Sequence, residues 1–281
     1  MHESSVPELY GIIGYPLGHS LSPFLHTTAF RLLDLPGFLT AWPMPPERLS
    51  DFVAAMRLLG VKGCCVTIPH KEAIMPLLDE VTDRVREIGS VNTLYRDGER
   101  ICGDNTDILG FTEPLLTENL SSETATLVLG AGGTARSVLV GLRSLGLNRI
   151  CVTSRRPEQA RGLADEFGCD TVAWERRDGV DFSLLVNTTA LGMAGKYENE
   201  TAFPREWLAG RRKGLAYDVV YTPHRTRLLR DAAMEEWRTI PGLEMFLGQA
   251  GHQFRIWTGR RFPPEARRLV AQLLASRSGS A

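Results

Sequence analysis

The chain has 281 residues, 43% of them hydrophobic and 23% charged, which is ordinary for a folded protein of one large or two average domains. Its 32 basic and 33 acidic residues leave a net charge of −1 without a marked basic patch, so we expect no nucleic-acid partner. Residues 1–8 lack the features of a signal peptide, no apolar run spans a bilayer, and the five cysteines lack zinc-type spacing. We therefore predict a cytoplasmic protein with reduced thiols, no membrane contact and no metal site.

Strands and helices alternate in the first part of the chain. Ser22 and Pro23 suit the cap and the first position of a helix over residues 22–33, and Asp97-Gly98 suits the tight turn of a hairpin. The alternation favours an α/β fold with a largely parallel, doubly wound sheet. The predicted strands of this part are residues 9–15, 39–44, 63–66, 91–95 and 100–103, and the further helices are 46–59, 71–78 and 82–88.

A second alternating set follows the polar segment 120–124, which resembles a domain boundary. One long helix with Pro114 inside it, over residues 107–119, is the expected connector. The predicted strands of the second set are residues 126–129, 149–153, 171–174, 183–187 and 215–220, and the last helices are 243–257 and 264–275.

A glycine-rich segment follows the strand 126–129 and opens a helix with the pattern G-x-G-x-x-A. Glycines there permit a tight turn and let the backbone approach a pyrophosphate at the helix N-terminus. In this strand–turn–helix setting the pattern favours a dinucleotide site over a purely structural turn. The residues concerned are Gly130, Ala131, Gly132, Gly133, Thr134 and Ala135.

The residues after the next strand indicate which dinucleotide binds. An NAD site usually has an acidic residue about twenty positions after the glycines, where it bonds the ribose hydroxyls. Ser154, Arg155 and Arg156 occupy that place here. A guanidinium pairs with a 2′-phosphate through two hydrogen bonds, whereas a carboxylate repels it. We therefore predict NADP, with two ordinary exposed arginines at a helix start as the alternative.

Lys71 stands where a lysine costs stability. It follows a short strand and Pro69 at the start of a predicted helix, where a cation opposes the helix dipole. Asp107 also follows a predicted strand, and ligands of doubly wound sheets bind beyond the carboxyl ends of strands. A lysine paired with a carboxylate suits proton transfer to a forming alkoxide, although a solvated surface lysine is the alternative. Other polar residues in such places are Ser20, Ser22, Thr67, Asn92 and the run Gly103–Asp107.

Taken in order, the motifs of this chain resemble the shikimate dehydrogenase family over essentially the whole length. The agreement of so many motifs in family order makes the resemblance specific. The matching segments are Gly14–Pro23, Val66–Lys71, Ser90–Thr93, Gly103–Asp107, Gly130–Gly133, Val186–Thr189, Leu191–Met193, Tyr217–Pro223, and Gly242-Leu243 with Gln249.

The resemblance implies a substrate domain at residues 1–119, completed by helices over residues 243–281, and a Rossmann-type NADP domain at residues 120–242. It implies reversible, NADPH-dependent reduction of 3-dehydroshikimate to shikimate, a step of chorismate and aromatic amino acid biosynthesis. Lys71 and Asp107 match the family's catalytic pair, and Ser20 and Ser22 match the serines that hold the substrate carboxylate. Matches to residues that read the ring hydroxyls are Thr67, Lys71, Asn92, Asp107 and Gln249, with Tyr221 nearby. Further cofactor positions are Thr188, Val219 and Gly242.

Some positions depart from the common family pattern and leave the choice of substrate open. His70 stands where a bulky apolar residue is frequent, Ser90 where alanine is common, and Ser154-Arg155-Arg156 replaces Asn-Arg-Thr. Quinate or an aminoshikimate is the near alternative as substrate. A non-catalytic ligand sensor is the more distant one, but such a relative is expected to lose Lys71, Asp107 or the glycine loop. We expect a monomer or a homodimer, which the sequence does not distinguish.

Overall fold

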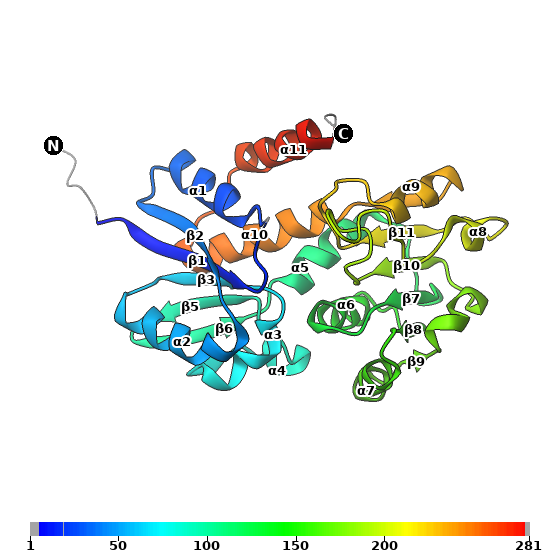
Figure 1. The fold of residues 1–281 in the computed structure, drawn as a ribbon, viewed down its shortest axis with the longest axis horizontal. Coiled ribbons are helices and arrows are strands. Elements are labelled where there is room, and N and C mark those ends of the chain that lie inside the picture. The colour runs from blue at the N-terminus through cyan, green and yellow to red at the C-terminus, as the bar shows by residue number, and fades with distance from the viewer. Residues whose placement is uncertain (1–5, 19, 279–281) are drawn as a thin grey trace. The chain divides into compact units, whose positions relative to one another are not determined.

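The structure is a computed structural model that describes residues 6–18 and 20–278. His19, which belongs to the first matching motif, and residues 1–5 of the segment without signal-peptide features lie outside the described residues. Chain contacts divide the protein into two units (Figure 1). Unit 1 contains residues 1–106 and 249–273, and unit 2 contains residues 107–248 and 274–281. These divisions lie at 106/107, 248/249 and 273/274, and the domain boundaries at 119/120 and 242/243 stay a prediction.

A six-stranded sheet of order β2-β1-β3-β5-β6-β4 forms the centre of unit 1 (Figure 1). β1 pairs in parallel with β2 and β3, whereas β5 runs antiparallel to both β3 and β6. The predicted hairpin is therefore present, and it makes this sheet mixed rather than largely parallel. The strands are β1 (Glu8–Gly14), β2 (Gly37–Pro43), β3 (Gly63–Val66), β4 (Glu80–Val81), β5 (Thr93–Asp97) and β6 (Arg100–Asp104).

Side-chain alternation along β1 and β3 gives the sheet of unit 1 two buried faces. Phe52 and Met56 of one helix pack with Cys64 and Val66 on one face. On the other face, the Tyr10 ring stacks on Phe30 with a centroid distance of 4.7 Å. The helices that begin in this part are α1 (Ser22–Leu32), α2 (Leu49–Leu58), α3 (His70–Ala73) and α4 (Asp83–Ile88), with short 3₁₀ helices η1 (Pro46–Arg48) and η2 (Met75–Leu77).

Unit 2 is built on a sheet of order β12-β11-β10-β7-β8-β9, in which every strand pair is parallel (Figure 1). The sequence missed β12, because three residues that include an exposed arginine carry too weak a strand pattern. The predicted strand 171–174 is also shorter, since a 3₁₀ helix, η4 (Trp174–Gly179), begins at its end. The strands are β7 (Thr126–Leu129), β8 (Ile150–Thr153), β9 (Asp170–Thr171), β10 (Leu184–Asn187), β11 (Leu215–Asp218) and β12 (Arg238–Ile240).

The connector predicted as one long helix over residues 107–119 consists of two shorter helices. The α-helix stops at Thr112 and a 3₁₀ helix carries Pro114, because proline lacks the N–H that an α-helix needs and crowds the preceding turn. Within the described residues, no helix combines the length and apolar character that crossing a bilayer requires. The helices are α5 (Asp107–Thr112), η3 (Glu113–Thr117), α6 (Gly133–Ser144), α7 (Pro157–Phe167), α8 (Arg205–Leu208), α9 (Arg227–Met234), α10 (Gly242–Thr258) and α11 (Pro264–Ser278).

Candidate active site

The loops that follow β1, β2 and β3 are joined at the carboxyl ends of these strands. The backbone N–H of Thr67 donates to the carbonyl of Ile13 at 2.9 Å, and that of Met44 donates to the carbonyl of Gly14 at 2.9 Å. A Cβ on Gly14 would lie 2.5 Å from Cγ2 of Thr67, so the close approach of the two loops requires glycine. This edge of the sheet therefore gathers Thr67 and the start of the loop that carries Ser20.

The two predicted carboxylate-binding serines have different local roles. Ser22 was expected to cap α1, but it is already the first residue of that helix, and it is buried with 3% of its surface exposed. Its backbone N–H donates to Oγ of Ser20 at 3.2 Å. The reason is that Leu21 has helical dihedral angles, which moves the helix start one residue towards the N-terminus. Ser20, not Ser22, therefore supplies a side-chain acceptor to the helix start.

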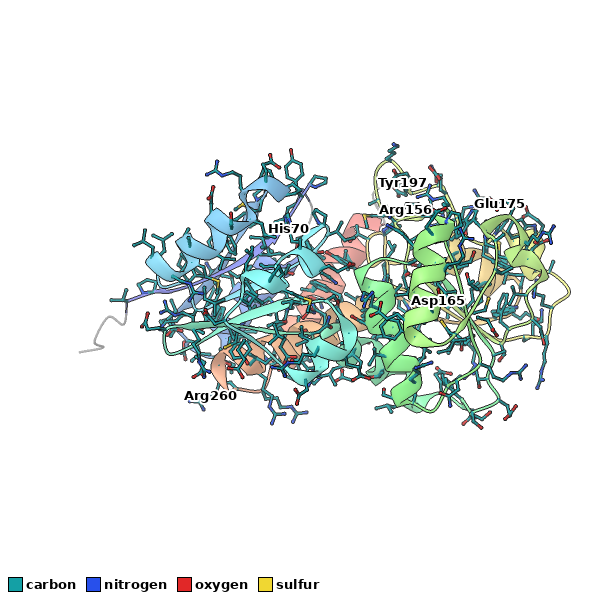
Figure 2. The ribbon with its side chains drawn as sticks, turned by 90° about the horizontal axis from the view of Figure 1, so that it is seen from below. His70, Arg156, Asp165, Glu175, Tyr197 and Arg260 are labelled. Carbon is teal, nitrogen blue, oxygen red and sulfur yellow. The ribbon has the colours of Figure 1, made fainter. Side chains whose placement is uncertain are left out.

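Lys71 is the second residue of α3 and is half-buried. Its backbone carbonyl accepts the N–H of Val91 at 2.7 Å, which ties the short helix to the segment before β5. The neighbouring His70 is 1% exposed (Figure 2), and its Nε2 lies 2.7 Å from the carbonyl of Met44. A carbonyl only accepts, so Nε2 carries the proton. His70, to which the sequence assigned no role, thus fastens the helix of Lys71 to the end of β2.

Asn92 is the centre of a buried hydrogen-bond network in unit 1. Its Oδ1 accepts from the backbone N–H of Thr106 at 2.8 Å and from the hydroxyl of Thr93 at 2.6 Å. Its Nδ2 donates to Oγ1 of Thr106 at 2.9 Å and lies 3.5 Å from Oε1 of Gln249. The structure therefore brings two predicted site residues, Asn92 and Gln249, together. Sequence reasoning noted Thr93 and Thr106 in its motifs but gave them no role, and it missed Gln253, which stands one helical turn after Gln249.

Ser90, the second departure from the family pattern, is also part of this buried polar region. The Nδ2 of Asn105 donates to the carbonyl of Ser90 at 2.9 Å and to its Oγ at 3.0 Å. An alanine at position 90 would lack the second acceptor. The serine therefore has a structural reason to be present.

Asp107 and Tyr221 belong to unit 2. Asp107 is 5% exposed, begins α5 and directly follows Thr106, whose backbone is bonded to Asn92. The division between the units lies at this peptide bond, so the pairing of Asp107 with Lys71 stays a prediction. The ring of Tyr221 stacks on that of Phe246 with centroids 4.5 Å apart.

The glycine loop connects β7 to α6. Gly130 has a φ of 115°, and a Cβ there would clash with Oγ1 of Thr188, so this position requires glycine. Thr188 in turn donates to the carbonyl of Leu129 at 2.9 Å. Gly132 precedes the helix and Gly133 begins it, and a Cβ on Gly132 would meet nothing within 4 Å. Space is therefore open beside the N-terminus of α6. Ala131 and Thr134 are half-buried, and Ala135 is buried.

The residues after β8 present positive charge. Oγ of Ser154 accepts the backbone N–H of Arg156 at 3.2 Å. Arg155 and Arg156 are exposed (Figure 2 labels Arg156), and within the described part of the chain neither forms an ion pair. Two guanidinium groups without a carboxylate neighbour are suited to an anionic group of a ligand.

The ends of β10 and β11 are held by a buried carboxyl. Oδ1 of Asp218 accepts from Nδ2 of Asn187 at 2.9 Å, and Oδ2 accepts from the hydroxyl of Thr226 at 2.6 Å. Burial raises the pKa of Asp218 to about 7, although its hydrogen-bond donors favour the charged form. Val219 follows and donates from its N–H to the carbonyl of Asn187 at 3.0 Å. Gly242, where α10 begins, passes directly beside the carbonyl of Val219.

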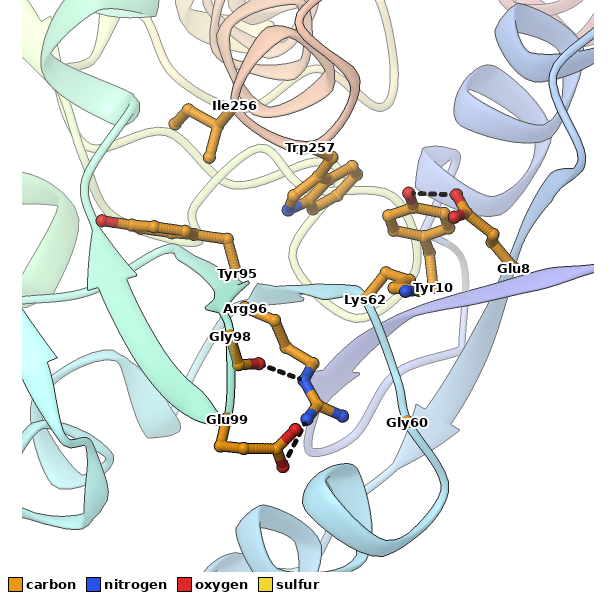
Figure 3. Close-up of a pocket in the computed structure, with 10 residues that line it drawn as sticks. All are labelled: Glu8, Tyr10, Gly60, Lys62, Tyr95, Arg96, Gly98, Glu99, Ile256 and Trp257. Carbon is orange, nitrogen blue, oxygen red and sulfur yellow. Dashed lines mark hydrogen bonds and ion pairs between the residues drawn. The ribbon is translucent and has the colours of Figure 1, made fainter.

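A cavity of about 470 Å³ lies elsewhere in unit 1, at the amino ends of β1 and β3 (Figure 3). Its polar groups are largely paired with one another: the hydroxyl of Tyr10 donates to Glu8 at 3.0 Å, and Arg96 forms an ion pair with Glu99 at 3.1 Å. No predicted site residue lines it. Among the described residues, no cluster of three or more His, Cys, Asp or Glu side chains is placed to hold a metal ion.

Similarity to known families covers both ends of the chain. The model of the shikimate dehydrogenase substrate binding domain matches residues 12–94. The model of the shikimate 5'-dehydrogenase C-terminal domain matches residues 242–267. The shikimate dehydrogenase (NADP(+)) of Pelobacter propionicus is 55% identical over 98% of this chain and 100% of its own length.

Solved structures of shikimate dehydrogenases are also similar to this chain, and they confirm the predicted two-domain α/β fold. The shikimate 5-dehydrogenase of Thermus thermophilus, in complex with NADP(H) and shikimate, has a TM-score of 0.85 and 36% identity, covering 95% of this chain and 99% of that one. The Listeria monocytogenes enzyme, in complex with shikimate and NAD, has a TM-score of 0.83 and 28% identity, covering 94% and 96%. By fold and by identity along nearly its whole length, the chain belongs to the shikimate dehydrogenase family.

Proposed function

We propose that this chain is an NADP-dependent oxidoreductase that interconverts 3-dehydroshikimate and shikimate, a step towards chorismate and the aromatic amino acids. The observation that carries the proposal is the 55% identity to a relative named shikimate dehydrogenase (NADP(+)), which extends over 98% of this chain. The chain also keeps Lys71, Asp107 and the glycine loop, which a non-catalytic ligand sensor would have no reason to keep together.

The cofactor would be held by unit 2, and its reduced form, NADPH, supplies the hydride for the reduction when bound. The open space beside Gly132 would admit the pyrophosphate to the N-terminus of α6, where backbone N–H groups and the helix dipole favour anions. Arg155, with Arg156 beside it, would pair with the 2′-phosphate. Supporting this, both side chains are exposed and without an ion pair in the described chain. Ser154, Thr188, Val219 and Gly242 would complete the cofactor site with the loop Gly130–Ala135.

Substrate recognition would rest on fixed donors. Ser20 and Ser22 would hold the carboxylate, with Thr67, Gln249 and Tyr221 among the groups that bond the ring hydroxyls. Asn92 would act as a hydroxyl-binding donor. The geometry that supports this role is that hydrogen bonds to Thr93 and Thr106 hold the Asn92 amide beside Gln249, a second predicted hydroxyl-binding residue.

Lys71 would act on the reacting carbonyl. Its ammonium would donate a proton as negative charge develops on the oxygen, and in the reverse direction its amine would take that proton back. Asp107 would orient the ammonium and bond a neighbouring hydroxyl. The hydrogen bonds that join α3 to Val91 and Met44 support this assignment, because a general acid must be held in position.

The test is a set of absorbance assays at 340 nm with shikimate or quinate, each with NADP or NAD. We expect shikimate with NADP to give by far the highest kcat/KM. A preference for quinate would move the chain to the alternative substrate, and a preference for NAD, the cofactor in the Listeria structure, would refute the role of Arg155. Binding of shikimate without turnover in any combination would support the sensor. We further propose a reducing, cytoplasmic setting, which the five cysteine thiols support.

A further inference from the structure

The strand order of unit 2 reverses between β7 and β10, so its sheet has two halves (Figure 1). Dinucleotides bind across such a reversal, with one nucleotide on each half. Arg155, the proposed partner of the 2′-phosphate, follows β8, so the adenosine nucleotide would lie on that half. The nicotinamide nucleotide would then lie at the carboxyl ends of β10 and β11, where the proposed cofactor positions Thr188 and Val219 stand.

A buried carboxyl adjoins both of these positions. Asp218 is the last residue of β11 and directly precedes Val219, and 0% of its surface is exposed. Its Oδ1 accepts from Nδ2 of Asn187 at 2.9 Å, and Asn187 directly precedes Thr188. Asp218 is therefore next to Val219 along the chain and is hydrogen-bonded to the neighbour of Thr188.

The partners of this carboxyl fit its ionised form. The backbone N–H of Val220 donates to Oδ1 of Asp218 at 3.0 Å, and the hydroxyl of Thr226 donates to Oδ2 at 2.6 Å. Nδ2 of Asn187 is a donor too, because it also donates to the carbonyl of Leu191 at 3.2 Å. A protonated carboxyl needs an acceptor, and among these partners only the hydroxyl of Thr226 is able to become one. Asp218 can therefore gain or lose its proton while its other two hydrogen bonds stay.

Burial, and not a neighbouring charge, raises the pKa of Asp218 to about 7, although its three donors favour the charged form. On α9, Arg227 pairs with Asp231 at 3.5 Å, and Arg230 donates to the carbonyl of Arg225 at 2.7 Å. In the described part of the chain, none of these groups causes the shift, and neither do the titratable residues of the loops after β10 and β11, which are Lys196, Glu198, Glu200, Tyr221 and His224. The charge of Asp218 therefore changes near neutral pH and has no counter-ion.

We propose that Asp218 is a specificity-determining residue for the redox state of the cofactor: its buried negative charge favours the cationic nicotinamide ring of NADP⁺ over the neutral ring of NADPH. The two forms carry the same phosphates, so the ring charge is the difference that a fixed charge can distinguish. A buried charge is screened little by water and salt, so Asp218 needs no contact with the ring. The inference rests on the proposed function, because it needs the cofactor to bind along unit 2.

The test measures dissociation constants of NADP⁺ and of NADPH by calorimetry between pH 6 and pH 8.5. Their ratio cancels what the two forms share, above all the phosphates. As pH rises and Asp218 ionises, the ratio in the parent should move about three- to tenfold in favour of NADP⁺, the scale of one charge acting at an effective dielectric constant of about 20. The midpoint should lie near pH 7. Asp218→Asn, which mimics the neutral carboxyl, should keep at every pH the ratio that the parent has at pH 6.

Proton release is a second measurement that does not depend on activity. If NADP⁺ favours the ionised carboxyl, its binding at pH 7 must release more protons than the binding of NADPH, because the effects of ligand and proton are reciprocal. Calorimetry in two buffers with different enthalpies of ionisation counts these protons. The difference between NADP⁺ and NADPH should vanish in Asp218→Asn.

Asp231→Asn is the matched control on α9, because its carboxylate already has a counter-ion in Arg227. His224→Gln removes the histidine of the loop after β11. Both variants should keep the pH dependence of the ratio. Arg155→Ala should weaken the binding of both cofactor forms and leave their ratio unchanged, because both carry the 2′-phosphate.

A ratio that does not change with pH in the parent overturns the inference, as does the same change in Asp218→Asn or loss of the change in His224→Gln. Should Asp218→Asn not fold, Thr226→Val carries the test. It removes a donor that favours the charged form of Asp218, so the midpoint should move to higher pH, whereas Thr226→Ser should keep it. Equal midpoints for these two variants also overturn the inference. Failure of the parent to bind either cofactor form would instead remove the proposed cofactor site, and the inference with it.

Discussion

The two units carry different kinds of groups at the carboxyl ends of their strands. In unit 1, buried amides and hydroxyls at one end of a mixed sheet bond to one another, with Asn92 at the centre. In unit 2, the ends of parallel strands carry a glycine loop with open space at Gly132 and exposed charge at Arg155. Unit 1 is therefore suited to a small polar molecule that must be read group by group, and unit 2 to a large anionic ligand that needs clearance and countercharge.

Their buried titratable groups also differ. In unit 1, His26 lies among the rings of Phe254 and Trp257, and burial lowers its pKa to about 3. In unit 2, burial raises the pKa of Asp218 to about 7. Desolvation shifts both groups towards their neutral forms, but one is a base and the other an acid, so the two units should respond to pH in opposite directions.

The largest expected effect is a loss of turnover without a loss of cofactor affinity. Lys71→Ala should lower kcat by about 10²- to 10⁴-fold, the usual contribution of a general acid, while NADPH binding stays nearly intact because no proposed cofactor contact is altered. Steady-state kinetics with a fluorescence titration of NADPH would measure both. Turnover close to that of the parent would refute the role of Lys71. A loss of NADPH affinity as large as the loss of kcat would refute the assignment of cofactor binding to unit 2.

A second change should weaken cofactor binding without weakening the fold. Gly132→Ala places its methyl group in open space, so the melting temperature should hold, but the methyl would obstruct the approach of a pyrophosphate. Loss of one charge-assisted hydrogen bond would weaken NADP binding about ten- to a hundredfold. Gly162→Ala in α7 is the control: it also meets nothing within 4 Å, and it should stabilise the protein by about 0.5–1 kcal/mol with unchanged NADP affinity. Equal NADP binding by both variants would contradict the glycine-loop site.

Acidification should change the free energy of unfolding of the two units in opposite directions. Below pH 6.5, its ordinary pKa, His26 takes up a proton in the unfolded chain but not in the folded one, so unit 1 should lose about 2 kcal/mol from this group by pH 5. Asp218 binds its proton more tightly when folded, so its contribution is greatest below pH 3.8 and declines as pH rises to about 7.

Hydrogen exchange of backbone amides, corrected for intrinsic rates, would follow each unit at pH 7 and pH 5. His26→Phe should flatten the pH response of unit 1 alone, and Asp218→Asn that of unit 2 alone. If each variant changed the pH dependence of exchange equally in both units, the predicted difference between the units would be wrong.

The smallest expected effect concerns the choice between NADP and NAD. Arg155→Ala should raise KM for NADPH about tenfold, the lower end for a charged hydrogen bond because the side chain is exposed, and should leave KM for NADH nearly unchanged. Arg156→Ala, one residue along, shows whether the two arginines share the 2′-phosphate. Equal effects of Arg155→Ala on both cofactors would exclude that contact.

Features that depend on local chemistry were predictable from the order of the residues. The glycine pattern between β7 and α6, the Asp97-Gly98 turn between β5 and β6, and Pro23 at the start of α1 each act within a few residues, so their patterns are readable in order along the chain. The family resemblance rests on such short motifs, and the comparisons confirm it.

Features that join residues far apart in the chain became visible only in the folded protein. Gln253 and Asn92 are 161 positions apart, and no local pattern indicates that the side chain of Gln253 donates to the carbonyl of Asn92. The link of His70 to Met44 and the placement of Ser20 at the start of α1 likewise depend on loops meeting at a sheet edge. Strand pairing fixes these distances, and buried polar atoms must then find partners wherever the fold brings one within reach. For that reason the motifs identified the family, while the supports of Asn92 emerged only from the folded chain.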